Sequence, residues 1–320
     1  MTRLMPEAPF ITFMTAAYNA QATLAETMGS LLAQTAGDWE MVLVDDGSAD
    51  GTLALAERLA ADDPRITVLS QPNAGAAAAR NRACTVARGR WWCVLDADDQ
   101  VLPGFVERMS RFIGGHPGYD LYSCGTEMRL PDGGVRLFDD RRRAQHVVSF
   151  SLDEMIERNR LHVTTVFAPA VHRLAGGFRN VYAEDYDFWL RALAGGAKHL
   201  HDPEVLAVYR VSPGGKNAAR DVAAKSVAAI LSDLAPTPGL DARTRRLAER
   251  MAAYYTASPA RWLLEERLRN GDVCDARRTY REVRAAYLSA PKYVVGLAAV
   301  TISPRLFARL LSRDHAASSV

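Results

Sequence analysis

The stretch Trp91-Trp-Cys-Val-Leu-Asp-Ala-Asp-Asp99 is an apolar run that ends in a cluster of aspartates. Its apolar part, Trp91 to Leu95, has the length of one β-strand, and an unbroken apolar run of this length is typical of a strand buried on both faces. The stretch therefore predicts a buried strand whose carboxyl end carries several carboxylates.

Similar apolar runs occur upstream and alternate with segments of helical spacing. The expected strands are Phe10 to Ala17, Trp39 to Val44 and Ile66 to Leu69, with a helix after each; Thr23 caps the first helix, and the third runs from Gly75 to Arg88. Strands that alternate with helices form a mainly parallel, doubly wound sheet, which binds ligands at the carboxyl ends of its strands. The predicted fold class is therefore α/β, with helices flanking the sheet.

Length and composition divide the chain into a large domain and a smaller helical region. With 320 residues, 48% of them hydrophobic, the chain exceeds one average domain and can bury a sizeable core. After Pro213-Gly214-Gly215 it has helical character to its end, and from Asp241 onward it carries 15 Lys and Arg against 8 Asp and Glu. We therefore predict one domain at 1–215 and a basic helical C-terminal region at 216–320.

The cysteines and the apolar windows indicate a cytoplasmic protein. Cys84, Cys93, Cys124 and Cys274 show neither a disulfide framework nor paired metal-ligand spacing, as expected for buried thiols in a reducing compartment. The N-terminus has no apolar run of signal-peptide length, and no window reaches the roughly 18 apolar residues of a membrane span. We expect no nucleic acid among the partners.

The segment Ser303 to Arg313 has the pattern of an amphipathic helix. Its arginines recur every four residues beside an apolar face, and the residues concerned are Arg305, Arg309, Arg313, Leu306, Phe307, Leu310 and Leu311. Such a helix could place residues 291–313 on the anionic inner face of the cytoplasmic membrane. The alternative is a helix that docks on the large domain with solvated arginines.

The aspartates that end the Trp91 strand are candidate metal ligands. Asp96 and Asp98 are two residues apart in strand phase and can present their carboxylates toward one site, with Asp99 beside them. Hard divalent cations prefer oxygen ligands of this kind. The alternative is a solvated turn, since aspartate is common where strands end.

Polar residues also follow the second and third strands. Asp46, in Asp45-Asp46-Gly47-Ser48, could accept the imide N–H of a uracil or thymine base, unless the segment is only a turn followed by a helix cap. Asn73-Ala-Gly75 places a turn before the helix that carries Arg80, whose guanidinium could reach a base or a phosphate. The alternative for Arg80 is an ordinary exposed arginine on an Ala-rich helix.

Far along the chain, Glu184-Asp185 opens a helix that ends at Gly195-Gly196. Backbone N–H groups at a helix start favour carboxylates and keep them ionised, and an ionised carboxylate in a cleft can be a general base. The alternative is stabilisation of the helix dipole without any catalytic role. A function for Asp185 is favoured only because the earlier motifs occur in the same chain.

These motifs occur together and in one order along the chain. They are Ala17-Tyr18-Asn19, Asp45-Asp46-Gly47-Ser48-Ala-Asp50-Gly51-Thr52, Asn73-Ala-Gly75, Ala79-Arg80-Asn81, Leu95-Asp96-Ala-Asp98-Asp99 and Glu184-Asp185. In this order and near this spacing they resemble family 2 of the glycosyltransferases, over about residues 10–210. One departure is Ala16, where the family often has proline.

The resemblance implies a GT-A type fold and an inverting enzyme that uses a nucleoside diphosphate sugar, with UDP favoured over GDP or dTDP, and Mn²⁺ or Mg²⁺. Residues 1–100 would bind this donor, and residues 101–215 would bind a glycan or lipid-linked acceptor in bacterial surface glycan or polysaccharide assembly. The implied donor contacts are Ala17, Tyr18, Asp46, Asn73, Arg80 and Asp96. Asp98 and Asp96 would hold the metal, and Asp185 would deprotonate the acceptor hydroxyl.

Two other functions stay open at this point. A sugar nucleotidyltransferase would share the sheet, but a glycine- and lysine-rich triphosphate loop should then follow the first strand, where Ala17-Tyr18-Asn19 stands. A non-catalytic nucleotide-sugar-binding protein would keep Asp46 and Asp98 yet tolerate loss of Asp185. A dinucleotide dehydrogenase is disfavoured, because no Gly-x-Gly-x-x-Gly follows Phe13.

Overall fold

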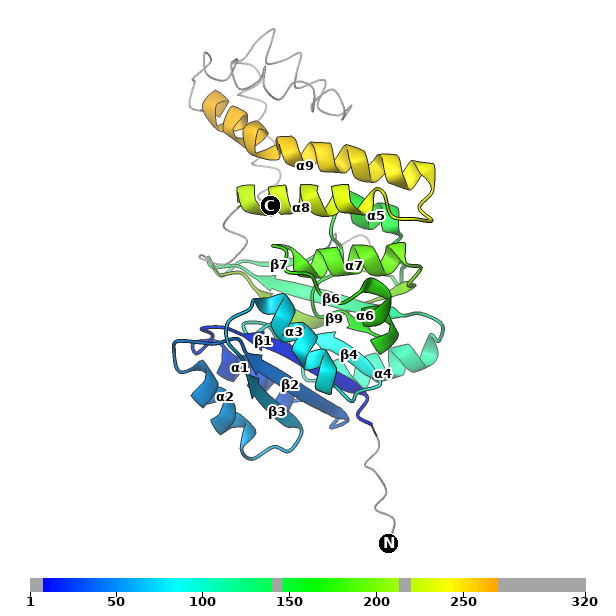
Figure 1. The fold of residues 1–320 in the computed structure, drawn as a ribbon. Helices are drawn as coiled ribbons and strands as arrows, with labels where there is room; N and C mark the ends of the chain where they lie inside the picture. The colour runs from blue at the N-terminus through cyan, green and yellow to red at the C-terminus, as the bar shows by residue number, and fades with distance from the viewer. Residues whose placement is uncertain (1–7, 140–145, 213–219, 270–320) are drawn as a thin grey trace. The chain divides into compact units, whose positions relative to one another are not determined.

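A computed structural model describes residues 8–139, 146–212 and 220–269. The chain divides into two compact units, Met1–Gly215 and Lys216–Val320. The first unit holds a mixed sheet and its helices (Figure 1), and the described part of the second holds two long helices. Cys274 and the predicted amphipathic segment at 303–313 lie outside the described residues.

Four parallel strands form the first half of the sheet. They are β1 (Ile11–Ala17), β2 (Trp39–Asp45), β3 (Ile66–Ser70) and β4 (Trp91–Val94), in the order β3-β2-β1-β4. Every pairing among them is parallel, so their carboxyl ends meet at one edge of the sheet. The strands expected from the apolar runs are confirmed.

Helices cover both faces of these strands. The side chains of β1 point alternately to the two faces and show which helices pack on each. Ile11 and Phe13 pack in one core with α1 (Leu24–Leu32) and α4 (Phe105–Gly115). Met14 points to the opposite face, where its sulfur lies 3.4 Å from Cys84 Sγ on α3 (Ala76–Val86). The remaining helix, α2 (Thr52–Ala60), contacts α1 and β3. Helices on both faces of an unbroken apolar strand are the doubly wound arrangement.

The second half of the sheet is mixed, and the sequence predicts it less well. Its strands are β5 (Gln100–Val101), β6 (Leu121–Arg129), β7 (Val135–Leu137), β8 (Val166–Phe167) and β9 (His199–Arg210). The sheet continues from β4 in the order β8-β6-β9-β5, and β7 pairs with β6. β6 and β9 are parallel, whereas β8 is antiparallel to both β4 and β6.

No strand is predicted from the sequence at β9, which is 12 residues long. Its first half contains Pro203 and several polar residues, which obscure the apolar run from Val205 to Tyr209. The register between β6 and β9 shifts on either side of Gly125, so Pro203 has no paired residue on β6. Such an irregularity tolerates a proline inside a strand. β8 is two residues long, and α6 (Pro169–Ala175) follows it closely.

Buried polar side chains join β6 to β9. The Ser123 hydroxyl lies 2.8 Å from His199 Nε2 and 2.8 Å from His201 Nδ1. The Phe150 N–H donates to His199 Nδ1 at 3.1 Å, so Nε2 of His199 carries the proton in the neutral ring. Each buried histidine thus has a hydrogen-bond partner, as a buried polar group requires.

His199→Gln should make the fold less sensitive to acid. Burial, followed by the neighbouring His201, lowers the pKa of His199 to about 3, so the folded protein keeps this ring neutral. Below about pH 6.5 the unfolded chain protonates it, and stability falls as the pH drops toward 3. From pH 7 to pH 5 this residue should remove about 2 kcal/mol from the free energy of unfolding.

Urea denaturation at pH 7 and pH 5 tests this prediction. The loss of stability between the two pH values should be smaller in His199→Gln than in the wild type, whatever the absolute stability of the variant. His116→Gln, at an exposed histidine, should lose as much as the wild type. Equal losses in all three proteins would show that His199 does not carry the effect.

The second unit contains α8 (Arg220–Leu234) and α9 (Ala242–Arg269), which pack against each other. Small buried residues allow close approach of the two helices, namely Ala224, Ala228, Ala248 and Ala252. In the part of the chain that the structure describes, no helix combines the length and apolar character needed to cross a membrane.

Candidate functional site

The loops after β1 and β2 are fastened to each other at the carboxyl edge of the sheet. The Asn19 N–H donates to Ser48 Oγ at 3.0 Å, and Asn19 Oδ1 accepts from the Ala49 N–H at 2.9 Å. Asn19 adopts a left-handed backbone with φ of 49°, which asparagine tolerates better than most residues. Ala17 ends β1 as a buried residue, and Tyr18 beside it is 54% exposed. The predicted base contact at Tyr18 thus has an accessible ring.

Asp46 organises the turn that follows β3. Its buried carboxylate accepts hydrogen bonds from Gln71 Nε2 at 2.7 Å, the Ala74 N–H at 3.0 Å and the Gly75 N–H at 2.8 Å. These contacts hold Asn73 next to the end of β2. The sequence suggests Asp46 as a base contact, and the structure adds that both its oxygens already serve this turn.

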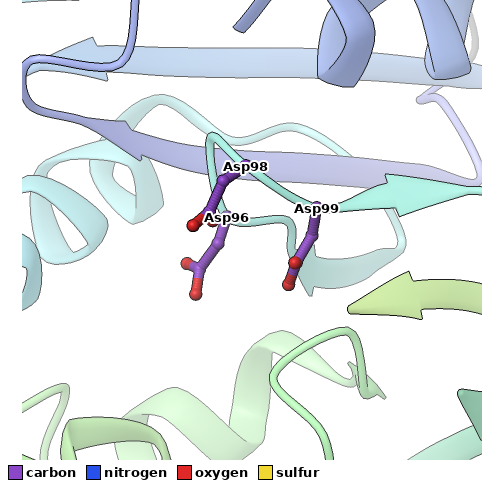
Figure 2. A group of neighbouring side chains, drawn as sticks. All are labelled: Asp96, Asp98 and Asp99. Carbon is purple, nitrogen blue, oxygen red and sulfur yellow. The ribbon is translucent and has the colours of Figure 1, made fainter. Parts of the chain in front are cut away.

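The loop after β4 carries the acidic cluster, Asp96, Asp98 and Asp99. Each offers a carboxylate oxygen, and these atoms lie within 4.8 Å of one another. Figure 2 shows the three side chains on the same side of the loop, with the Asp96 and Asp98 carboxylates adjacent and Asp99 to one side. This set of hard oxygen donors has the chemistry that a divalent cation needs.

Two hydroxyl groups hold the start of this loop. Thr15 Oγ1 donates to the Leu95 carbonyl at 2.7 Å, and Thr23 Oγ1 donates to the Ala97 carbonyl at 2.8 Å. Thr23 stands at the predicted cap position of α1, but its side chain makes no capping hydrogen bond. The predicted cap position of Thr23 is confirmed, but its hydroxyl donates to the acidic loop rather than capping the helix.

Asp99 is the buried member of the cluster, with 1% of its surface exposed. Its Oδ1 accepts from the Arg210 N–H on β9 at 3.0 Å, and its Oδ2 lies 3.5 Å from His162 Nε2. Burial raises the pKa of Asp99 well above its usual range, and the carboxylates of Asp96 and Asp98 add to the rise. Asp99 is thus held from the β9 side of the loop.

Arg80 joins the acidic cluster to α7 (Glu184–Ala194). It is only 3% exposed, so the alternative of an ordinary surface arginine is wrong. Its Nη2 lies 2.6 Å from Asp96 Oδ1, and its Nη1 lies 3.0 Å from Glu184 Oε1. Although burial acts in the opposite direction, the two carboxylates raise the pKa of Arg80. In this structure the guanidinium serves as a bridge between two carboxylates.

Asp185 lies beside this bridge, at the second position of α7. Burial raises its pKa to about 6, the negative charge of Glu184 adds to the rise, and Arg80 opposes it. Asp185 directly follows Glu184, which Arg80 links to Asp96 of the acidic cluster. The two sequence motifs therefore meet at one site.

The loop before α7 is clamped by Asn81, to which the sequence assigns no role. Its Nδ2 donates to the Phe178 carbonyl at 2.8 Å, and its Oδ1 accepts from the Phe178 N–H at 2.9 Å. Gly177 has φ of +78°, and a Cβ there would lie 3.1 Å from Asn81 Oδ1, so glycine fits this close approach. Asn81 thereby fixes the segment that leads to Asp185.

Comparison with known proteins identifies the family. The model for Glycosyl transferase family 2 matches residues 12–168. EpsE of Bacillus subtilis (strain 168) is 30% identical over 217 residues, which cover 65% of this chain and 74% of EpsE. The chain belongs to glycosyl transferase family 2.

Another relative of this family 2 chain is the succinoglycan biosynthesis protein ExoO of Rhizobium meliloti (strain 1021). The two are 31% identical over 221 residues, which cover 65% of this chain and 62% of ExoO. The chain spans 38% of the length of one further curated relative. These relatives therefore extend beyond the matched region.

The mannosyltransferase PcManGT from Pyrobaculum calidifontis, solved in complex with GDP-Man and Mn²⁺, shares the fold of the family 2 chain. The TM-score is 0.62 at 17% identity, and the match covers 96% of this chain and 86% of PcManGT. The predicted GT-A type α/β fold is confirmed.

Proposed function

We propose that this protein transfers a sugar from a nucleoside diphosphate sugar to an acceptor hydroxyl, with inversion at the anomeric carbon. The observation that supports this most is the Arg80 bridge, which joins the acidic cluster through Asp96 to the start of α7 through Glu184. It brings a cation-binding set of carboxylates and a carboxylate of raised pKa, Asp185, to one site. A single-displacement glycosyl transfer needs these two parts.

The donor would bind at the carboxyl edge of the parallel strands. Its proposed contacts are Ala17, Tyr18, Asp46, Asn73, Arg80 and Asp96, all on β1, α3 or the loops that follow β1, β2, β3 and β4. The nucleoside diphosphate would be UDP, GDP or dTDP. PcManGT binds GDP-Man with Mn²⁺, which supports a nucleotide sugar and a divalent cation in general.

Asp98 and Asp96 would hold a divalent cation, Mn²⁺ or Mg²⁺. When bound, the cation supplies positive charge for the diphosphate leaving group as its bond to the sugar breaks. Both side chains are partly exposed, in contrast to the buried Asp99, so both carboxylates are accessible to a ligand. Asp96 in addition keeps its contact with Arg80, which limits its freedom to move.

Asp185 would act as the general base. Its carboxylate accepts the proton of the acceptor hydroxyl while that oxygen attacks the anomeric carbon. The new carbon–oxygen bond forms on the face opposite the diphosphate, whose bond to the sugar breaks in the same step. This displacement inverts the anomeric configuration and requires no covalent intermediate with the protein.

We place this reaction in bacterial surface glycan or polysaccharide assembly, on a glycan or lipid-linked acceptor. The relative ExoO is named as a succinoglycan biosynthesis protein, which supports a role of this kind. Residues 1–100 would then bind the donor and residues 101–215 the acceptor. The reaction would occur in the cytoplasm or at the inner face of the cytoplasmic membrane.

Asp98→Asn should remove the metal-dependent part of donor binding. A ligand at 100 times its dissociation constant stabilises the folded state by about 2.7 kcal/mol, which thermal shift detects readily. UDP-, GDP- and dTDP-sugars would be tested with and without Mn²⁺ on the wild type and the variant. We expect the wild-type shift with its donor to depend on Mn²⁺, and the variant shift to lose that dependence.

Asp62→Asn is the matched control, because Asp62 is an exposed aspartate outside the acidic cluster. It should keep the wild-type response to Mn²⁺. A response to Mn²⁺ that is the same in Asp98→Asn and in the wild type would refute the assignment of Asp98 as a metal ligand.

A further inference from the structure

His162 lies behind the acidic cluster, in the segment between α5 (Leu152–Glu157) and β8. It is 8% exposed, and its ring is 5.2 Å from the ring of Phe138 and 5.1 Å from that of Tyr209, measured between centroids. Both neighbours approach at steep angles, 70° for Phe138 and 49° for Tyr209. The imidazole is therefore packed between two aromatic rings and has little freedom to rotate.

The hydrogen bonds of His162 define which ring nitrogen carries its proton. Nδ1 accepts from the Thr164 N–H at 3.4 Å and lies 2.7 Å from Thr164 Oγ1. A backbone N–H can only donate, so Nδ1 is an acceptor and the neutral ring carries its hydrogen on Nε2. Nε2 is the atom that faces Asp99 Oδ2, at 3.5 Å.

Asp99 needs a donor at the oxygen that His162 faces. Asp99 Oδ1 accepts from the Arg210 N–H, whereas Oδ2 is buried and makes no hydrogen bond in the structure. A buried acceptor left unsatisfied costs about 1–3 kcal/mol, and more when it is charged. His162 Nε2 lies 3.5 Å from this oxygen, so a small closure of that separation would allow the N–H to donate to it.

We propose that His162 is a positioning residue for the metal site. By holding the Asp99 carboxylate against β9, it fixes the loop 96–99 in the conformation in which Asp96 and Asp98 face the cation. This inference rests on the proposed function, because it concerns the same metal site. It adds a residue from a distant segment that contacts neither the donor nor the acceptor in the proposed mechanism.

A role through Asp99 fits the geometry better than direct ligation. Among the described residues, the candidate ligand group whose atoms lie within 4.8 Å of one another consists of the three aspartates and does not include His162. The Nε2 atom reaches Asp99, the buried aspartate on the β9 side of the loop. His162 therefore orients a member of the cluster, as outer residues of metal sites commonly do.

Mn²⁺ titrations followed by electron paramagnetic resonance test the proposal, with Mn²⁺ alone and with Mn²⁺ plus UDP or GDP. His162→Phe keeps the ring volume but removes the Nε2–H, and we expect it to weaken Mn²⁺ binding about 10- to 100-fold. His162→Gln, which can still donate from a side-chain amide, should recover at least part of this loss. His116→Phe, at an exposed histidine, should bind Mn²⁺ as the wild type does.

A double-mutant cycle with Asp99→Asn separates positioning from other roles. If His162 acts through Asp99, His162→Phe should cost much less Mn²⁺ affinity in the Asp99→Asn background than in the wild type. Costs that simply add would overturn the proposal, as would an unchanged affinity in His162→Phe. A wild-type protein that binds no Mn²⁺ with any nucleotide would instead refute the proposed function.

Circular dichroism would first establish that His162→Phe folds. If it does not, Thr164→Val provides the second variant, because it removes the hydroxyl that lies 2.7 Å from His162 Nδ1. Weaker Mn²⁺ binding in the folded Thr164→Val protein would support the proposal, and wild-type affinity would contradict it.

Discussion

Asp185→Asn should lower the rate of sugar transfer by about 10²- to 10⁴-fold, the usual contribution of a general base. An amide of the same shape cannot accept the acceptor's proton, whereas the proposed contacts of the nucleotide sugar lie on other residues. Donor binding, measured by thermal shift with Mn²⁺, should therefore change little. The rate would be measured with the donor identified by that screen and a matching glycan acceptor.

The pH dependence of the wild type provides an independent check on Asp185. Burial, reinforced by the charge of Glu184, raises its pKa to about 6, so the carboxylate is ionised and active above that pH. The rate should fall about tenfold for each pH unit below 6. A rate that is constant from pH 7 to pH 5, or an Asp185→Asn variant of wild-type activity, would refute the base assignment.

The same variant should be more stable than the wild type at high pH. Keeping Asp185 ionised in its partly buried position costs up to about 3 kcal/mol, which the amide avoids. This cost is present above the folded pKa of about 6 and disappears as the pH falls toward 3.8, the ordinary value of aspartate. The Asp185→Asn protein should therefore melt above the wild type at pH 8 and with it near pH 4.

The first half of the fold could be predicted from sequence because its signals are local. β1, β2 and β4 are buried apolar runs, and the helices between the strands have apolar residues at helical spacing. One further rule is that the carboxyl ends of parallel strands lie at the same edge of the sheet. This rule places Asp46 and Asp96 at one edge. Local periodicity and one topological rule are sufficient for these elements.

The rest depends on contacts between distant segments, which no local pattern contains. The first half of β9 is mostly polar, and it joins the sheet because His199 and His201 lie within hydrogen-bond distance of Ser123 and Asp202 pairs with Arg108. In the sequence, Asn81 is one of several polar residues on α3. Its role depends on the hydrogen bond to Phe178, which lies far along the chain. The alternative of an exposed Arg80 failed for the same reason, since its second partner is Glu184 on α7.

Arg80→Met should lower the free energy of unfolding by about 3–5 kcal/mol, because it removes the buried cation that pairs with Asp96 and Glu184. Glu184, whose side chain is 6% exposed, should account for most of the loss, and Asp96, at 34%, for less. Glu184→Gln should therefore restore part of the stability when combined with Arg80→Met. Denaturation by urea would measure both, with Arg82→Met as the control, at a partly exposed arginine of the same helix that donates to the Ser70 carbonyl.

The catalytic consequence of Arg80→Met distinguishes a bridge from a simple stabilising contact. Arg80 opposes the rise in the pKa of Asp185, so its removal should raise that pKa above 6 and move the acid limb of the rate profile to higher pH. A merely structural arginine would lower stability without shifting this limb. Because one guanidinium contacts Asp96 and Glu184 and acts on Asp185, its loss should change stability, metal affinity and the pH profile together.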